Sequence, residues 1–133
     1  MAPLYSGLDA IHRNPDLKLV YRPKLFTTFF GLDQGSAELR TSNIKGKNPF
    51  QDRRVREAIA YAIDVNTVLR PLMGDLFIPA GMMVAPGVNG YASDLDEPLR
   101  HDPKRARALL VEAGYPDGFS VTIDCPNEWG DDE

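Results

Sequence analysis

Apolar residues recur with helical spacing in one continuous stretch, residues 48–74, which predicts two consecutive helices. In its first half the apolar side chains stand at i, i+3, i+4, i+7 and i+8 on one helical face; they are Val55, Ala58, Ile59, Ala62 and Ile63. The second half repeats this pattern with Val65, Val68, Leu69, Leu72 and Met73. Asp52 and Asp64 are placed to cap the two helices, Gly74 ends the second, and Pro71 predicts that the second is short or kinked. We expect the two apolar faces to share one core.

A third helix is predicted after residue 101. Asp102 stands at the N-cap position and Pro103 at the first helical position, where a missing backbone N–H does no harm. Its apolar face comprises Ala106, Leu109, Leu110 and Ala113. Gly114 and Pro116 end the helix, because glycine accepts the left-handed conformation and proline cannot continue the helix.

Three segments have the composition of β-strands. Residues 17–21 alternate apolar and polar side chains, and residues 25–32 are rich in aromatic and β-branched ones, as in a strand buried on both faces. Residues 119–123 alternate again and predict a half-buried strand. A short helix near Leu8 and Ile11 precedes them. Together the segments predict an α+β fold, with a small mixed β-sheet packed with helices.

Two segments have neither helical nor strand periodicity. Residues 34–47 are polar and carry glycine, serine and asparagine, which predicts a solvated surface loop. Residues 76–90 mix proline and glycine with apolar side chains, including Met82 and Met83. An apolar segment that cannot be helical either packs against the core or lines a pocket, and simple packing is the favoured alternative.

Composition limits the classes of function. The chain has 133 residues, 43% hydrophobic and 26% charged, which is typical of one soluble globular domain. Its 15 Lys and Arg against 19 Asp and Glu leave a net charge of -4, so a nucleic-acid partner is not expected. No apolar run approaches the ~20 residues that cross a bilayer, and no export signal is recognisable at the N-terminus.

Residues with catalytic or metal-binding chemistry are few. Cys125 is the single cysteine, which excludes an internal disulfide and a cysteine-based zinc site. His12 and His101 stand in turn-like surroundings without other ligands at metal-binding spacing, so we expect neither a metal site nor a cofactor. Arginines and carboxylates form a charged cluster over residues 52–57, where local ion pairs are favoured over an anion site.

Three motifs carry a resemblance to a known family. They are NPFQDRRVREAIAYAID at residues 48–64, APGVNGY at residues 85–91 and DPKRARALLVEAGYPDGF at residues 102–119. Their order resembles the C-terminal lobe of family 5 extracytoplasmic solute-binding proteins, which are the oligopeptide-, dipeptide- and nickel-binding components of ABC importers. The similarity spans residues 4–125.

The resemblance implies a two-lobed, type II periplasmic-binding-protein-like architecture, of which this chain forms one lobe. Residues 1–16 resemble the last helix of the first lobe at the approach to the hinge, and residues 17–133 resemble part of the C-terminal lobe. Family members are several times longer and carry a secretion signal or lipoprotein anchor. The chain is therefore expected to be a fragment of a periplasmic or otherwise extracytoplasmic parent protein.

The resemblance also implies a function and a set of ligand-facing positions. The parent would close two lobes around a small, peptide-like solute, with no bond-making step, and deliver it to the ABC permease subunits. The positions expected to face the ligand cleft are Phe30, Asp33, Cys125 and Asn127, joined by Met82 and Met83 of the apolar loop.

Two alternatives and one further expectation accompany this interpretation. The chain could be a stand-alone adaptor that uses residues 82–91 as its interaction surface, or an enzyme with Cys125 as nucleophile. Strands 25–32 and 119–123 would lose neighbours in an isolated lobe. Because unpaired strand edges invite association, we expect a homo-oligomer formed by exchange of a strand or of the N-terminal helix.

Overall fold

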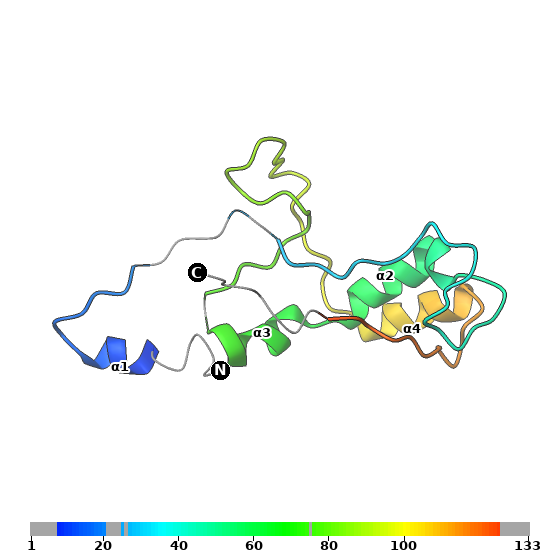
Figure 1. Ribbon diagram of the computed structural model, residues 1–133, viewed down its shortest axis with the longest axis horizontal. Coiled ribbons are helices and arrows are strands. Elements are labelled where there is room, and N and C mark those ends of the chain that lie inside the picture. The colour runs from blue at the N-terminus through cyan, green and yellow to red at the C-terminus, as the bar shows by residue number, and fades with distance from the viewer. Residues whose placement is uncertain (1–7, 21–24, 26, 75, 126–133) are drawn as a thin grey trace. The chain divides into compact units, whose positions relative to one another are not determined.

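The computed structural model describes residues 8–20, 25, 27–74 and 76–125 (Figure 1). The described helices are α1 (Leu8–Arg13), the 3₁₀ helix η1 (Pro49–Gln51), α2 (Arg53–Ala62), α3 (Val65–Met73) and α4 (Pro103–Glu112). The chain divides into two compact units. The first unit comprises residues 1–30 and 63–101, and the second unit comprises residues 31–62 and 102–133.

Helix α2 forms as its apolar spacing predicts. The Asp52 carboxylate accepts a hydrogen bond from the Arg54 N–H at 2.9 Å, as an N-capping side chain does. Val55 and Ala58 are buried on the inner face of α2. Ala58 packs against Ala106 and Leu109 of α4, and Figure 1 shows the two helices side by side. Small side chains at this contact let the two helix backbones approach closely.

Helix α4 begins and ends as predicted. The Asp102 carboxylate accepts the Arg105 N–H at 2.9 Å, and Pro103 occupies the first turn. At its C-terminal end the Tyr115 N–H donates to the Leu110 carbonyl, and the Gly114 N–H donates to the Val111 carbonyl. These two bonds form a Schellman motif, which requires the positive φ of 86° that Gly114 adopts.

Helix α3 has the predicted ends. Asp64 caps it by accepting the Thr67 N–H, Pro71 lies inside it, and Gly74 ends it with a φ of 61°. Because α2 and α3 belong to different units, the core that they were expected to share stays a prediction. The apolar partner of α2 is α4, and Val68 of α3 remains 55% exposed. Periodicity identifies an apolar face but cannot identify what covers it.

The small mixed β-sheet is not confirmed. Residues 17–20 and 27–32 form no strand, and the pairing within the described part of the chain is one antiparallel bridge between Ser42 and Val121. Two backbone hydrogen bonds flank that bridge, Asn43 N–H to Ser120 O at 3.1 Å and Thr122 N–H to Thr41 O at 2.9 Å. A strand depends on a partner segment for its hydrogen bonds, and these apolar segments have none among the described residues.

The polar segment 34–47 is only partly the solvated loop that was expected. Leu39 is 5% exposed and belongs to the core of the second unit, together with Phe50, Val55 and Tyr115. Ser42 is also buried, and its hydroxyl bonds with the backbone of Ile44. Isolated apolar residues in a polar stretch leave no periodic pattern, so the burial of Leu39 could not be predicted.

Candidate functional site

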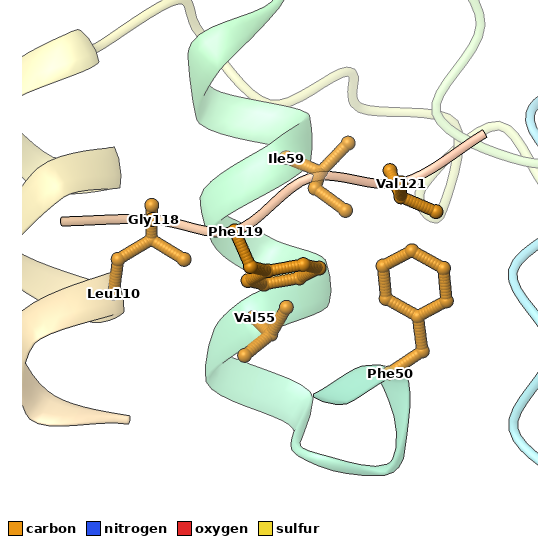
Figure 2. A pocket seen from close by; sticks show the side chains of 7 residues that line it. All are labelled: Phe50, Val55, Ile59, Leu110, Gly118, Phe119 and Val121. Carbon is orange, nitrogen blue, oxygen red and sulfur yellow. The ribbon is translucent and has the colours of Figure 1, made fainter. Parts of the chain in front are cut away.

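An apolar hollow lies on the second unit beside α2 (Figure 2). Its volume is about 170 Å³, and its lining residues are Phe50, Val55, Ile59, Leu110, Gly118, Phe119 and Val121. Figure 2 shows the Phe119 side chain lying over α2, close to Val55. The Phe119 ring centroid is 6.1 Å from that of Phe50 and 5.1 Å from that of Tyr115, within the range of favourable tilted aromatic pairs.

The lining of this hollow limits what it can bind. All seven lining residues have apolar side chains or, in the case of Gly118, none. Orientation of a polar solute requires a few fixed hydrogen-bonding groups, which these side chains do not supply. The hollow therefore fits an apolar group, and its main physical role is packing between α2 and the segment after α4.

Beside it, the buried side chain of Asn48 organises the loop that carries Asp33. The Asn48 amide nitrogen donates to the backbone carbonyls of Asp33 and Ser36, both at 2.9 Å. Its amide oxygen accepts the Phe50 N–H at 2.9 Å. Asn48 is only 5% exposed, and these bonds satisfy a side chain that would be costly to bury unpaired. The sequence analysis missed this role, although an asparagine directly before Pro49 is a common start of a helical turn.

The Asp33 carboxylate is held by its own loop. One oxygen accepts the N–H groups of Gly35 at 2.9 Å and Ser36 at 3.0 Å. Hydrogen bonds from the Ser36 side chain, then from the Ser36 and Gly35 amides, lower the pKa of Asp33 below its ordinary value of 3.8 and outweigh the opposing effect of burial. The group is thus ionised at neutral pH and offers a negative charge on an exposed loop.

In the first unit, the Asp96 carboxylate gathers three hydrogen bonds. It accepts the N–H groups of Gly81 at 2.6 Å and Met82 at 3.2 Å and the Tyr91 hydroxyl at 3.0 Å. The Gly81 amide is the largest cause that lowers the pKa of Asp96, whereas the hydrogen bond from the Tyr91 hydroxyl to Asp96 raises the pKa of Tyr91. These contacts join residues up to 15 positions apart, so no local pattern predicted them.

The predicted ligand-facing residues lie on both units. Phe30 and Met83 of the first unit are 60% and 63% exposed, and Met82 is half-buried. Asp33 and Cys125 of the second unit are exposed. Asn127 lies outside the described residues. None of these side chains lines the hollow of Figure 2. Their role toward a ligand stays a prediction.

Comparison with known proteins decides the family. The family model described as bacterial extracellular solute-binding proteins, family 5 Middle, matches residues 2–133. The chain belongs to this family. The family resemblance inferred from the three sequence motifs is thereby confirmed.

Two curated relatives of this family 5 chain are glutathione-binding proteins. The chain is 34% identical over 119 residues to glutathione-binding protein GsiB of Salmonella choleraesuis (strain SC-B67) and 31% identical to GsiB of Escherichia coli (strain K12). Each alignment covers 90% of this chain and 21% of the relative, so the chain spans about a fifth of the length of these relatives. No solved structure matches the chain.

The charged residues of this family 5 chain around the start of α2 pair locally, as the sequence predicted. Arg54 contacts Asp52 at 2.6 Å, and Arg53 contacts Glu57 one helical turn away at 2.7 Å. The Arg56 guanidinium donates to the Phe50 carbonyl at 2.7 Å. A free anion site is therefore not formed by these arginines.

Within the described residues, no group of three His, Cys, Asp or Glu side chains is placed to hold a metal ion. No described helix combines the length and the apolar composition that a membrane span requires.

Proposed function

We propose that this chain is part of the solute-binding component of an ABC importer and forms part of one wall of its ligand cleft. The observation that carries the proposal is the family match over residues 2–133. The two curated relatives, both named as glutathione-binding proteins, add support. In this proposal the longer protein is two-lobed, with residues 1–16 at the hinge approach and residues 17–133 in the C-terminal lobe, where segments outside this chain complete a small mixed sheet.

The proposed ligand is a small peptide-like solute, and glutathione is the first candidate because the relatives are named for binding it. The proposed contacts are Phe30, Asp33, Met82, Met83, Cys125 and Asn127. Asp33 suits a positively charged group such as an α-amine, because its carboxylate is ionised at neutral pH and exposed. Exposed Phe30 and Met83 supply apolar area.

The proposed mechanism is closure of the two lobes around the solute without a chemical step, followed by delivery to the permease outside the cytoplasm. A binding protein needs no nucleophile. Cys125 is therefore proposed only to contact the solute and not to react with it.

The test is a titration of reduced glutathione, glutathione disulfide and short peptides into the longer protein and into this chain. Binding is followed by calorimetry, and closure by a decrease in the radius of gyration in X-ray scattering. We expect the longer protein to bind one of these solutes and close, and this chain to bind it far more weakly. Equal affinity of the isolated chain would favour the stand-alone adaptor instead.

A matched pair of variants sharpens this titration. Asp33→Asn keeps an oxygen for the loop amides but removes the charge, and is expected to weaken binding of an amine-bearing solute about tenfold, the effect of ~1.4 kcal/mol. Asp117→Asn removes an equally exposed charge from the turn after α4 and serves as the control. An unchanged affinity for Asp33→Asn would remove Asp33 from the proposed contacts.

We further propose that the isolated chain self-associates through its exposed apolar segments. Val20, Leu25 and Phe29 are 73%, 68% and 59% exposed in the first unit. Apolar side chains at such exposure gain free energy when a second copy covers them. Sedimentation velocity across a concentration series is expected to show a concentration-dependent dimer or larger species, whereas a constant monomer would contradict this proposal.

A further inference from the structure

Residues 81–96 form a loop whose two ends are joined by one carboxylate. One oxygen of Asp96 accepts the Gly81 N–H at 2.6 Å and the Met82 N–H at 3.2 Å. The other oxygen accepts the Tyr91 hydroxyl at 3.0 Å. Hydrogen bonds to an ionised carboxylate are stronger than hydrogen bonds between neutral groups. The three bonds to Asp96 therefore hold the two ends of the loop together firmly.

The backbone at the closure is too tight for any residue except glycine. A Cβ atom at position 81 would lie 2.5 Å from the backbone N and carbonyl carbon of Glu97. Gly81 therefore allows the first residue of the loop to reach both Asp96 and the residue that follows it. This is a close backbone approach of the kind that glycine permits.

The interior of the loop is held by its own turns. Backbone hydrogen bonds join Val88 to Ala85 at 3.1 Å, Tyr91 to Val88 at 3.1 Å and Leu95 to Ala92 at 3.0 Å. Ala85 is buried at the centre with 5% exposure, although most of its neighbours are exposed. The loop is thus built from short hydrogen-bonded turns, and one of its residues, Ala85, is buried.

We propose that Asp96 is a positioning residue that fixes the backbone of Gly81 and Met82 and so holds Met82 and Met83 in place before any solute arrives. That these two methionines meet the solute rests on the function proposed above; the closure itself does not. Ordering this segment in advance removes an entropy cost that binding would otherwise carry. It gives flexible methionine side chains a fixed backbone from which to adapt to different apolar groups.

The closure depends on the charge of Asp96, which gives it a recognisable pH dependence. The folded loop lowers the pKa of Asp96 below 3.8, first through the Gly81 amide and then through Tyr91 and Met82, which together outweigh the opposing effect of burial. The stabilisation is therefore complete above pH 3.8 and is lost as the pH falls through the lowered pKa. The other titratable groups of this segment are Tyr91, which donates to Asp96, and the neighbouring carboxylates Asp94 and Glu97.

The test is an NMR titration of the intact, nitrogen-15-labelled chain, which needs no ligand. The Gly81 and Met82 amide resonances are expected to shift together as the pH is lowered, with a midpoint below 3.8. In Asp96→Asn this shift disappears, while an amide oxygen still accepts the two N–H groups. In Asp96→Ala the protection of these amides against hydrogen exchange falls about tenfold or more, since an ionised acceptor is lost.

Two further variants separate closure from general loosening. Asp94→Ala removes an exposed carboxylate two residues from Asp96. It is expected to leave unchanged both the pH titration of the Gly81 and Met82 amide resonances and the protection of these amides against hydrogen exchange. Tyr91→Phe moves the midpoint upward, because one donor to the charged form is removed. Amide resonances of the second unit, such as that of Gly118, report that each variant is folded. The proposal is overturned if the two amides fail to titrate, or if Asp94→Ala and Asp96→Ala lower protection equally. A failed glutathione titration with an intact closure would count against the proposed function alone.

Discussion

The two units of this chain bury their apolar side chains to very different extents. The buried apolar side chains of the second unit are Leu39, Phe50, Val55, Ala58, Ala106, Leu109 and Tyr115, whereas among the described residues of the first unit Ala85 alone is buried. The large exposed apolar side chains of the first unit include Leu17, Val20, Leu25, Phe29, Phe30, Val68, Ile78, Met83, Leu95 and Leu99. Those of the second unit are Val111, Val121 and Ile123.

This difference separates what folds by itself from what needs a partner. The second unit is a helix pair with its own core, capped ends and a satisfied buried asparagine. The first unit has capped helices and a closed loop, but its apolar surface lacks cover from the described residues. The relatives are about five times longer than this chain, and in the proposed function the cover is supplied by the rest of a longer polypeptide together with the solute.

The largest expected effect comes from comparing a buried side chain of α4 with an exposed side chain of α3. Leu109→Ala removes a side chain that is 2% exposed between α2 and α4, and is expected to lower the unfolding free energy of the second unit by about 2–5 kcal/mol. Val68→Ala on α3, where the side chain is 55% exposed, is expected to change that free energy by less than about 0.5 kcal/mol. Urea unfolding followed by circular dichroism measures both. Equal losses would show that α3 belongs to the same core.

A second effect concerns the buried hydrogen bonds of Asn48. Asn48→Ala leaves two carbonyls and one N–H without their partner, and is expected to cost the second unit about 2–3 kcal/mol. Asn89→Ala changes an exposed asparagine in the first unit and is the matched control. Thermal unfolding of the two variants compares them. A Tm unchanged by Asn48→Ala would mean that water replaces the three bonds without loss.

A third effect is the loss of stability when an aspartate N-cap is removed, which differs between α4 and α3. Asp102→Ala removes the cap of the packed helix α4 and is expected to cost about 1 kcal/mol of the stability of the second unit. Asp64→Ala removes the cap of α3 and is expected to loosen α3 without changing the stability of the second unit. Hydrogen exchange of the helix amides separates the two results. A global loss from Asp64→Ala would contradict the independence of the units.

The smallest effect is the contribution of Asp52 to acid stability. The side-chain bond from Arg54 is the largest cause that lowers the pKa of Asp52 below 3.8. The carboxylate therefore stabilises the second unit fully above pH 3.8, and this contribution is lost as the pH falls through the lowered pKa. Asp52→Asn is expected to flatten the stability profile slightly below pH 4. An unchanged profile in denaturant unfolding at a series of pH values would assign the acid sensitivity to other groups.

The helices were predictable from the sequence because their determinants are local. Asp64, Asp102 and Gly114 stand next to the helix ends that they define, and the apolar spacing of α2 and α4 lies within each helix. The strands could not be predicted in this way, because a strand forms only when a second segment pairs with it. Residues 27–32 have no such pairing segment among the described residues. Sequence likewise identified an apolar face on α3 without saying what covers it.

The candidate contacts were predictable only through the family resemblance. Nothing local singles out Asp33, and the turn that holds its carboxylate became visible only in the structure. The roles of Asn48 and Asp96 were missed because most of their partners lie 12 to 15 residues away in sequence. Polar side chains with tertiary partners leave no periodic pattern, so folded coordinates were needed to find them.

Hydrogen exchange of individual amides in the intact chain tests the contrast between the units most directly. The account predicts that the inner amides of α2 and α4 exchange together, slowly, and only through unfolding of the whole second unit. The amides of α3 should exchange much faster, through local opening. Equal protection of α2, α3 and α4, with the same dependence on denaturant, would contradict the account and show one cooperative core spanning the chain.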